Sequence, residues 1–291
     1  MSRINQSALN PLPQPDSPGY QARVTSAKQE TPLLSVDRLS VRFPKADAPV
    51  IDRVSFSIDQ GSTLALVGES GAGKSMTGLA VQRLIPDPGR ITEGRITWKG
   101  IDLLTLPESR MRKIRGGEIG TVWQEPSSVM NPAIKVGRQI AEVVKVHTGV
   151  SAREARRKAV ELLDHVRIPD GANRYHAYPG ELSGGMLQRV VIAAAIACRP
   201  DLLIADEATT ALDASVQRQV LELISELQSE IGMAILFVTH NLALVAEMAD
   251  QVAVMRRGRI VESGAVLDLF ENPTGGYTRE LLEASPNLLA G

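Results

Sequence analysis

One stretch of eight residues constrains this chain more than any other: Gly68-Glu69-Ser70-Gly71-Ala72-Gly73-Lys74-Ser75. The apolar run from Thr63 to Val67 precedes it and helix-forming residues follow it, so the context is strand, glycine loop and helix. Successive backbone N–H groups can surround phosphate oxygens only where no Cβ blocks their approach, and the following helix adds a partially positive N-terminus. We therefore predict a phosphate-binding loop in which Lys74 reaches the β- and γ-phosphates of a nucleotide and the Ser75 hydroxyl binds Mg²⁺.

The composition is that of an ordinary globular protein, and it argues against several kinds of partner. The 291 residues carry 32 basic and 33 acidic side chains, a net charge of -1, and 3% of them are aromatic. A broad positive field and a set of stacking platforms are therefore both lacking, and we do not expect nucleic acid as a partner. Cys198 is the sole cysteine, which excludes a disulfide framework and a cysteine cluster for zinc or iron–sulfur.

Apolar stretches in this sequence are short. The longest uninterrupted one, from Val190 to Cys198, falls well below the ~20 residues that span a bilayer. The first residues also lack the apolar core of a signal peptide. We expect a soluble protein in a reducing compartment, whose membrane role, if it has one, arises through partners.

Three parts of the chain differ in pattern. Residues 1–31 are rich in proline and polar residues and lack a helical or strand period, so we expect a flexible tail. Residues 32–265 alternate apolar strands with helices, which predicts an α/β domain with a mainly parallel sheet. An antiparallel strand element is expected before the phosphate loop, and a helical insertion at about residues 125–187. Residues 266–291 are expected to form a short helical extension.

Polar side chains follow three further predicted strands. Ile119 to Trp123 ends at Gln124, Leu202 to Ala205 ends at Asp206-Glu207, and Ala234 to Val238 is followed by Thr239-His240. The ends of parallel strands converge on one crevice, so these residues and the phosphate loop are expected to lie close together. A histidine after a strand is also often only structural.

Together these residues supply the parts of Mg²⁺-dependent ATP hydrolysis, in which catalysis is mostly positioning and charge neutralisation. We expect Asp206 to hold Mg²⁺, in part through water, and Glu207 to orient and polarise the attacking water. Gln124 can bond the metal shell or that water, and His240 can donate to the γ-phosphate.

Two features have both a structural and a functional interpretation. Ser183-Gly184-Gly185 precedes a long apolar helix, so it can bind a terminal phosphate or simply cap a core helix. Phe43 lies in an alternating strand segment, where it can contact an adenine ring or pack in the core. The basic run from Arg153 to Lys158 is interleaved with glutamates and is interpreted as a solvated surface.

Over residues from about 33 to 284 the sequence resembles the ATPase subunit of an ATP-binding cassette (ABC) transporter. The most specific element is Leu182-Ser183-Gly184-Gly185-Met186 followed by Gln188-Arg189, which matches the family signature. The resemblance implies the fold of an ABC nucleotide-binding domain: a P-loop NTPase core with an antiparallel β subdomain and an inserted helical subdomain. It assigns Gln124 to the Q-loop, Asp206-Glu207 to the Walker B end, Asp213 to the D-loop and His240 to the switch histidine.

The resemblance also implies partners. Two such subunits, identical or not, pair head to tail, so that Ser183 and Gly185 of one contact the γ-phosphate held by Lys74 of the other. The helical subdomain would receive a coupling helix from integral membrane permease subunits, and an extracytoplasmic solute-binding protein would act indirectly. The expected location is peripheral, on the cytoplasmic face of the inner or plasma membrane.

Two segments narrow the subfamily. Gln124 to Pro132 is similar to the segment found in importers of peptides and nickel, and Tyr277 to Leu282 resembles their C-terminal motif. This favours an ATPase subunit of an importer of short peptides. The alternatives are a non-transport ATPase of the same superfamily, such as an accessory subunit of a phosphonate-degrading complex, and a nucleic-acid-associated ATPase. The single cassette and the lack of a basic extension argue against the last.

Overall fold

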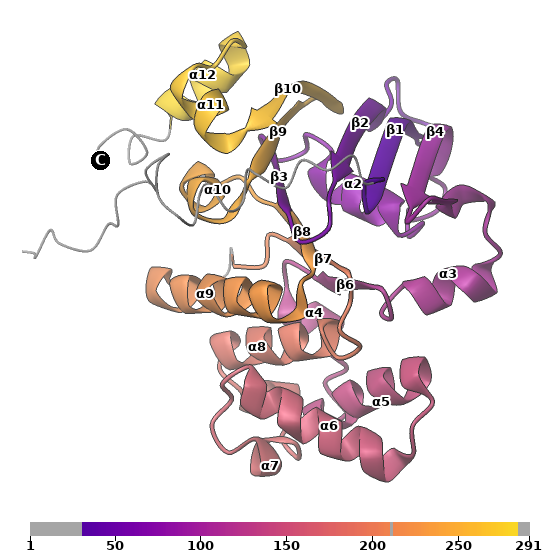
Figure 1. The fold of residues 1–291 in the computed structure, drawn as a ribbon, viewed down its shortest axis with the longest axis vertical. Coiled ribbons are helices and arrows are strands. Elements are labelled where there is room, and N and C mark those ends of the chain that lie inside the picture. Colours follow the sequence, from indigo (N-terminus) through magenta and orange to yellow (C-terminus); the bar gives the residue numbers. More distant parts are fainter. Residues whose placement is uncertain (1–30, 210–211, 285–291) are drawn as a thin grey trace, which may run out of the picture.

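The computed structural model describes residues 31–209 and 212–284, so nearly all of the tail expected over residues 1–31 lies outside the described residues. Two sheets form its framework (Figure 1). The smaller sheet has the order β2-β1-β4-β5 and is antiparallel, which confirms the antiparallel element expected before the phosphate loop. Its strands are β1 (Leu34–Arg42), β2 (Ile51–Ile58), β4 (Arg90–Trp98) and β5 (Ile101–Asp102).

Two short apolar patterns near the start of the domain, Leu33–Val36 and Leu39–Phe43, each indicate a strand, and the prediction of two separate strands is wrong. Most of both patterns lies in the single strand β1, whose register with β2 shifts on both sides of Leu39. Arg38 takes a φ of 45° within this irregular stretch. The polar pair Asp37-Arg38 interrupts the apolar alternation of the sequence. The irregularity in the register accommodates this pair, so the strand continues through it.

The larger sheet carries the phosphate loop. Its order is β10-β9-β3-β8-β7-β6, and every pair from β9 to β6 is parallel, while β10 runs antiparallel to β9. The strands are β3 (Thr63–Val67), β6 (Ile119–Val122), β7 (Leu202–Asp206), β8 (Ala234–Val238), β9 (Gln251–Arg256) and β10 (Arg259–Ala265). The mainly parallel α/β sheet predicted from the sequence is therefore confirmed.

Two hydrophobic cores lie on opposite faces of this sheet. Ala65 and Val67 of β3 belong to the core that packs under the helices, whereas Leu64 and Leu66 belong to the core shared with the smaller sheet. The five residues of β3 are all buried, as expected for a central strand covered on both faces. The loop that follows β3 therefore begins at a strand that is buried between the two cores.

The helical insertion lies at the opposite end of the molecule from the smaller sheet (Figure 1). It contains α4 (Pro126–Val129), α5 (Val136–Thr148), α6 (Ala152–His165), α7 (Gly171–Arg174), the 3₁₀ turn η2 (Pro179–Glu181) and α8 (Gly184–Ala195). The residues from Val136 to Val166 have a helical pattern, but the structure divides this stretch at Gly149, which takes a φ of 69°. Ser151 then caps α6 by accepting a hydrogen bond from the Glu154 N–H.

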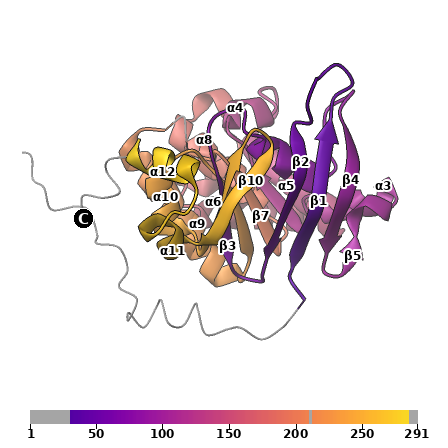
Figure 2. The ribbon, with the colours of Figure 1, turned by 90° about the horizontal axis from the view of Figure 1, so that it is seen from above.

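The remaining helices connect and flank the strands. They are α2 (Lys74–Val81), the 3₁₀ turn η1 (Leu103–Thr105), α3 (Glu108–Ile114), α9 (Ala214–Ile231), α10 (Leu242–Met248), α11 (Val266–Glu271) and α12 (Gly276–Glu283). Figure 2 shows α11 and α12 beside β10, in agreement with Figure 1. Within the described ranges no helix combines the length and apolar character needed to cross a membrane.

Candidate active site

The phosphate loop joins β3 to α2 and contains three glycines with positive φ. These are Gly68, Gly71 and Gly73, with φ of 147°, 80° and 103°. A Cβ on Gly68 would lie 2.1 Å from the Met255 carbonyl oxygen, and one on Gly73 would lie 2.8 Å from that of Val50. Gly68 and Gly73 are thus required both by conformation and by close backbone approach. The helix α2 begins at Lys74, within the eight-residue loop sequence.

Lys74 is buried inside the loop. Its Nζ donates hydrogen bonds of 2.9 Å to the carbonyl oxygens of Gly68 and Glu69. Burial lowers the pKa of Lys74, while the nearby carboxylates of Glu207 and Asp206 oppose that shift. The ammonium group is therefore held inside the loop by two of its carbonyl oxygens, and its predicted contact with the β- and γ-phosphates stays a prediction.

Ser75 and Asp206 lie together although 131 positions separate them. The Ser75 hydroxyl donates a 2.8 Å hydrogen bond to Asp206 Oδ1 at the end of β7. Asp206 is 7% exposed, and burial raises its pKa, with the bond from Ser75 opposing the shift and the charge of Glu207 adding to it. One hydroxyl and one carboxylate at this separation are oxygen donors of the type that Mg²⁺ prefers, so the residues present fit that ion.

Glu207 and His240 form a second pair next to the first. The pairing of β7 with β8 sets Asp206 opposite Val238, and the Glu207 N–H donates to the Val238 carbonyl oxygen at 2.9 Å. His240 Nδ1 then lies 3.3 Å from Glu207 Oε1. Glu207 takes a φ of 46°, an uncommon conformation for a residue with a side chain and one that recurs at functional sites.

Gln124 occupies a different position from these pairs. It lies two residues beyond the end of β6, is exposed, and lines a cavity of about 320 Å³ together with Gly184. Within residues 31–209 and 212–284 no hydrogen bond joins Gln124 to Ser75 or Asp206. The structure therefore brings Gln124 beside the signature helix, and its contact with a metal shell or water stays a prediction.

The signature segment has a clear structural role. Ser183 caps α8 by accepting a hydrogen bond of 3.3 Å from the Met186 N–H, which confirms its predicted capping position. A Cβ on Gly185 would lie 2.6 Å from Val216 Cγ1, so the segment packs closely against α9. In the described part of the chain no hydrogen bond or ion pair links Ser183, Gly184 or Gly185 to the phosphate loop. A phosphate contact by these residues stays a prediction.

Two further predicted site residues have structural partners. Asp213 caps α9, where its Oδ1 accepts bonds from the Ser215 hydroxyl and from two backbone N–H groups, and these bonds lower its pKa. Phe43 is half-buried against the core of the smaller sheet, where a Cβ on Gly89 would lie 2.5 Å from its ring. Nucleotide contacts by Asp213 and Phe43 stay predictions.

Sequence reasoning missed one side chain at the loop. The Tyr277 hydroxyl, on α12, accepts a 3.2 Å hydrogen bond from the Glu69 N–H. The sequence from Tyr277 to Leu282 resembles a subfamily motif, and this resemblance predicts no contact with the loop. A buried tyrosine in a C-terminal helix gives no local signal of its long-range partner, so the contact became visible only in the fold.

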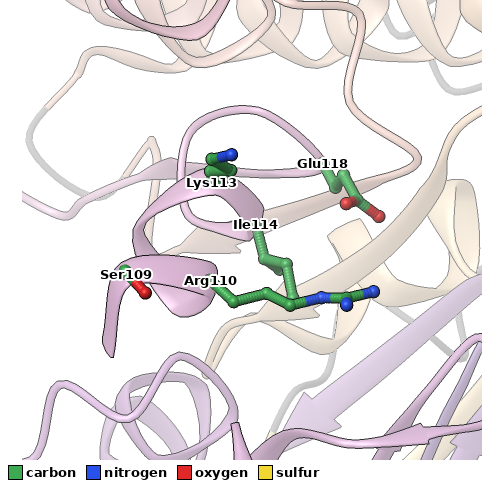
Figure 3. A pocket seen from close by; sticks show the side chains of 5 residues that line it. All are labelled: Ser109, Arg110, Lys113, Ile114 and Glu118. Atoms are coloured by element: carbon green, nitrogen blue, oxygen red, sulfur yellow. The ribbon is translucent and has the colours of Figure 1, made fainter. Parts of the chain in front are cut away.

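A second cavity, of about 410 Å³, lies beside α3 and away from the predicted site residues. Figure 3 shows its lining side chains on α3 and the loop after it: Ser109, Arg110, Lys113, Ile114 and Glu118. None of these belongs to the predicted site. The nucleotide site is instead the loop and the strand ends that meet it.

A glycine loop with a buried lysine, a serine–aspartate pair and a glutamate–histidine pair at the ends of parallel strands define a P-loop ATPase with a helical insertion. The ABC transporter family model matches residues 51–210, and the chain belongs to this family. It binds and hydrolyses ATP as its family does.

Relatives and solved structures agree with this assignment. The chain is 48% identical over 256 residues to the dipeptide transport ATP-binding protein DppD of Escherichia coli, covering 87% of this chain and 78% of that protein. It is 48% identical over 261 residues to the oligopeptide transport ATP-binding protein OppD of Bacillus subtilis, covering 89% and 73%. A solved dimeric ATP-binding cassette bound to ADP and Pi shares the fold, with a TM-score of 0.71 and 24% identity over 80% of this chain and 98% of that one.

Proposed function

We propose that this chain is the ATP-hydrolysing subunit of a binding-protein-dependent importer of dipeptides or oligopeptides. The relatives that share nearly half of its residues are named for the transport of these solutes. The observation that supports ATP hydrolysis is that the two side-chain pairs are adjacent. Asp206, which accepts a bond from Ser75, is followed directly by Glu207, which lies beside His240. The alternative of a phosphonate-degrading accessory subunit gains no support from these relatives.

The proposed mechanism assigns each group one task. The loop N–H groups, Lys74 and the N-terminus of α2 bind the phosphates and fix the terminal phosphoryl group. The Ser75 hydroxyl, Asp206 acting through water, and Gln124 would hold Mg²⁺, which would supply positive charge to neutralise the phosphates. Glu207 orients the attacking water and accepts its proton, while His240 donates to the γ-phosphate.

The same proposal includes a dimer. The signature residues lie at the start of α8, in the helical part of the chain, whereas the phosphate loop joins β3 of the larger sheet to α2 (Figure 1). A second ATPase subunit, identical or different, would therefore bring its Ser183-Gly184-Gly185 to the γ-phosphate held by Lys74. In that arrangement Asp213 would lie beside the nucleotide, and Phe43 would contact the adenine ring.

We propose that residues 32–265 form the nucleotide-binding domain, with a helical insertion at about residues 125–187, and that residues 266–291 form a short helical extension. The helical insertion would receive a coupling helix from integral membrane permease subunits. The ATPase would then lie peripherally on the cytoplasmic face of the membrane, with a solute-binding protein acting on the other side.

Affinity purification of the tagged full-length chain from detergent-solubilised membranes tests the proposal. Recovery of integral membrane permeases, together with ATP-dependent uptake of a labelled dipeptide by vesicles reconstituted from that complex, is the expected result. Recovery of a complex made only of soluble enzymes would contradict the import function and leave the ATPase assignment intact.

A further inference from the structure

A side chain of the helix α12 contacts the phosphate loop. The Tyr277 hydroxyl accepts a hydrogen bond of 3.2 Å from the Glu69 N–H, between residues 208 positions apart. We propose that Tyr277 is a positioning residue for the phosphate loop, and that through it the C-terminal helix sets the affinity for nucleotide. This proposal rests on ATP binding by the loop and is independent of the solute that is transported.

The contact holds one peptide group from both sides. The Glu69 N–H and the Gly68 carbonyl belong to the same planar peptide, and they point in opposite directions because the bond is trans. Lys74 Nζ binds the Gly68 oxygen at 2.9 Å, while Tyr277 binds the N–H. Rotation of this peptide would break both hydrogen bonds. Tyr277 therefore fixes the acceptor that positions the ammonium group of Lys74.

This peptide is the part of the loop that most needs a restraint. Gly68 takes a φ of 147°, and glycine has wide backbone freedom because it lacks a Cβ. The Met255 carbonyl oxygen leaves no room for a side chain at Gly68, since a Cβ there would lie 2.1 Å from that oxygen. Tyr277 supplies a directional restraint on the peptide that follows, which the Met255 contact cannot provide.

The tyrosine itself is held rigidly. Tyr277 is 7% exposed, and the Arg256 guanidinium lies 4.3 Å from the centroid of its ring. The Glu262 carboxylate accepts hydrogen bonds from Thr274, Gly275 and the Thr278 hydroxyl, so residues on both sides of Tyr277 are tied to β10. The hydroxyl is therefore already in place before a nucleotide binds.

Loss of this hydroxyl has a specific expected effect. The Glu69 N–H would lose its partner and the Gly68–Glu69 peptide would gain freedom, which ATP binding would then have to remove. The Ser75–Asp206 bond and the Glu207–His240 contact join residues outside α12, so both contacts should persist. The effect should fall on nucleotide affinity and leave turnover at saturating ATP nearly unchanged.

Tyr277→Phe tests the proposal, because it removes the hydroxyl and retains the ring under Arg256. Tyr178→Phe, on the exposed side of the helical insertion, is the matched control. Titration with a fluorescent ATP analogue and steady-state hydrolysis should show Kd and KM for nucleotide rising about three- to tenfold in Tyr277→Phe, with kcat within about twofold. Hydrogen exchange at the Glu69 amide should be faster than in the wild-type protein and in Tyr178→Phe.

Two results would overturn the proposal. One is unchanged nucleotide affinity and unchanged Glu69 exchange in Tyr277→Phe. The other is a parallel fall of kcat and melting temperature with unchanged KM, which would assign Tyr277 a structural role only. Failure of the wild-type protein to bind ATP would instead contradict the nucleotide site itself, so the two failures are distinguishable.

Discussion

The buried position of the Asp206 carboxylate destabilises the folded protein. Its raised pKa, caused first by burial, means that the folded state disfavours the charged form relative to the unfolded chain. A neutral side chain of the same shape should therefore stabilise the protein at pH 7. Asparagine keeps an oxygen that can accept the Ser75 hydroxyl bond without carrying the charge.

We expect Asp206→Asn to raise the free energy of unfolding of the nucleotide-free protein by on the order of 1 kcal/mol while nearly abolishing hydrolysis. Urea unfolding in EDTA and phosphate release measure the two effects. Asp47→Asn, at an exposed loop position, is the matched control and should change neither. A less stable Asp206→Asn variant would contradict the electrostatic argument.

Glu207 is the residue on which the hydrolytic assignment depends. Glu207→Gln removes the carboxylate that accepts the proton of water, but it leaves the phosphate loop intact. We expect ATP binding to persist and turnover to fall about 10²- to 10⁴-fold, with a stable dimer forming in ATP on size-exclusion chromatography. Glu222→Gln, at an exposed position on α9, should behave as wild type. Near-normal hydrolysis by Glu207→Gln would remove it from this role.

Residues next to a distinctive backbone pattern could be predicted from the sequence, and the others could not. The loop from Gly68 to Ser75 is predictable because its glycines serve a local backbone requirement. Asp206 and His240 are predictable because they end apolar strands, and parallel strands share an edge. Tyr277 is not, because its partner is 208 positions away and no local pattern encodes that distance.

The segment that links β10 to α12 depends on one carboxylate. Burial alone would raise the pKa of Glu262, but hydrogen bonds from Thr278, Thr274 and Gly275 outweigh it and lower the pKa to about 2. Because the pKa is lower in the folded state, this stabilisation is complete well above the ordinary value of 4.5 and is lost as the pH falls through about 2.

We therefore expect the backbone amides of Thr274 to Ala284 to stay protected from hydrogen exchange in the wild-type protein at pH 3.5, where an ordinary glutamate is mostly protonated. Glu262→Gln should lose much of that protection at pH 7, and its difference from wild type should shrink as the pH approaches 2. Glu271→Gln, exposed at the end of α11, is the control. Loss of wild-type protection already near pH 4.5 would contradict the hydrogen-bonded anchor.

Among the elements, those with a strong period were predicted well and their boundaries less well. The apolar runs that became β3, β7 and β8 needed only their own residues to be recognised as buried strands. The residues from Leu187 to Cys198 indicate a helix over that range, but α8 runs from Gly184 to Ala195, because Ser183 caps it at an earlier position. The order of strands in the larger sheet depends on crossovers, and hydrophobic pattern alone does not determine them.

For the whole molecule, the separation of α8 from the phosphate loop makes the site depend on a second subunit in our proposal. A mixture of Ser183→Arg and Lys74→Ala proteins tests this directly. Each variant alone would lack a complete site, whereas a mixed dimer would combine an intact loop from the first with an intact signature from the second.

We expect neither variant alone to hydrolyse ATP and the mixture to recover about a quarter of the wild-type rate, since half of the randomly formed dimers would carry one good site. Differently tagged copies, purified in sequence, confirm that mixed dimers have formed. An inactive mixed dimer would show that the signature does not act on the partner's loop. Mixing either variant with itself under different tags is the control.

The order of strands around β3 also bears on how the chain acquires its site during synthesis. Both neighbours of β3 in the sheet, β8 and β9, come from residues 234–256, long after the phosphate loop has left the ribosome. The strands β1, β2 and β4 can pair as soon as residue 98 has emerged, but β3 must then remain without a sheet partner. Nascent chains that stop before β8 should therefore be aggregation-prone and unable to retain nucleotide, which makes the late strands the point at which this ATPase is completed.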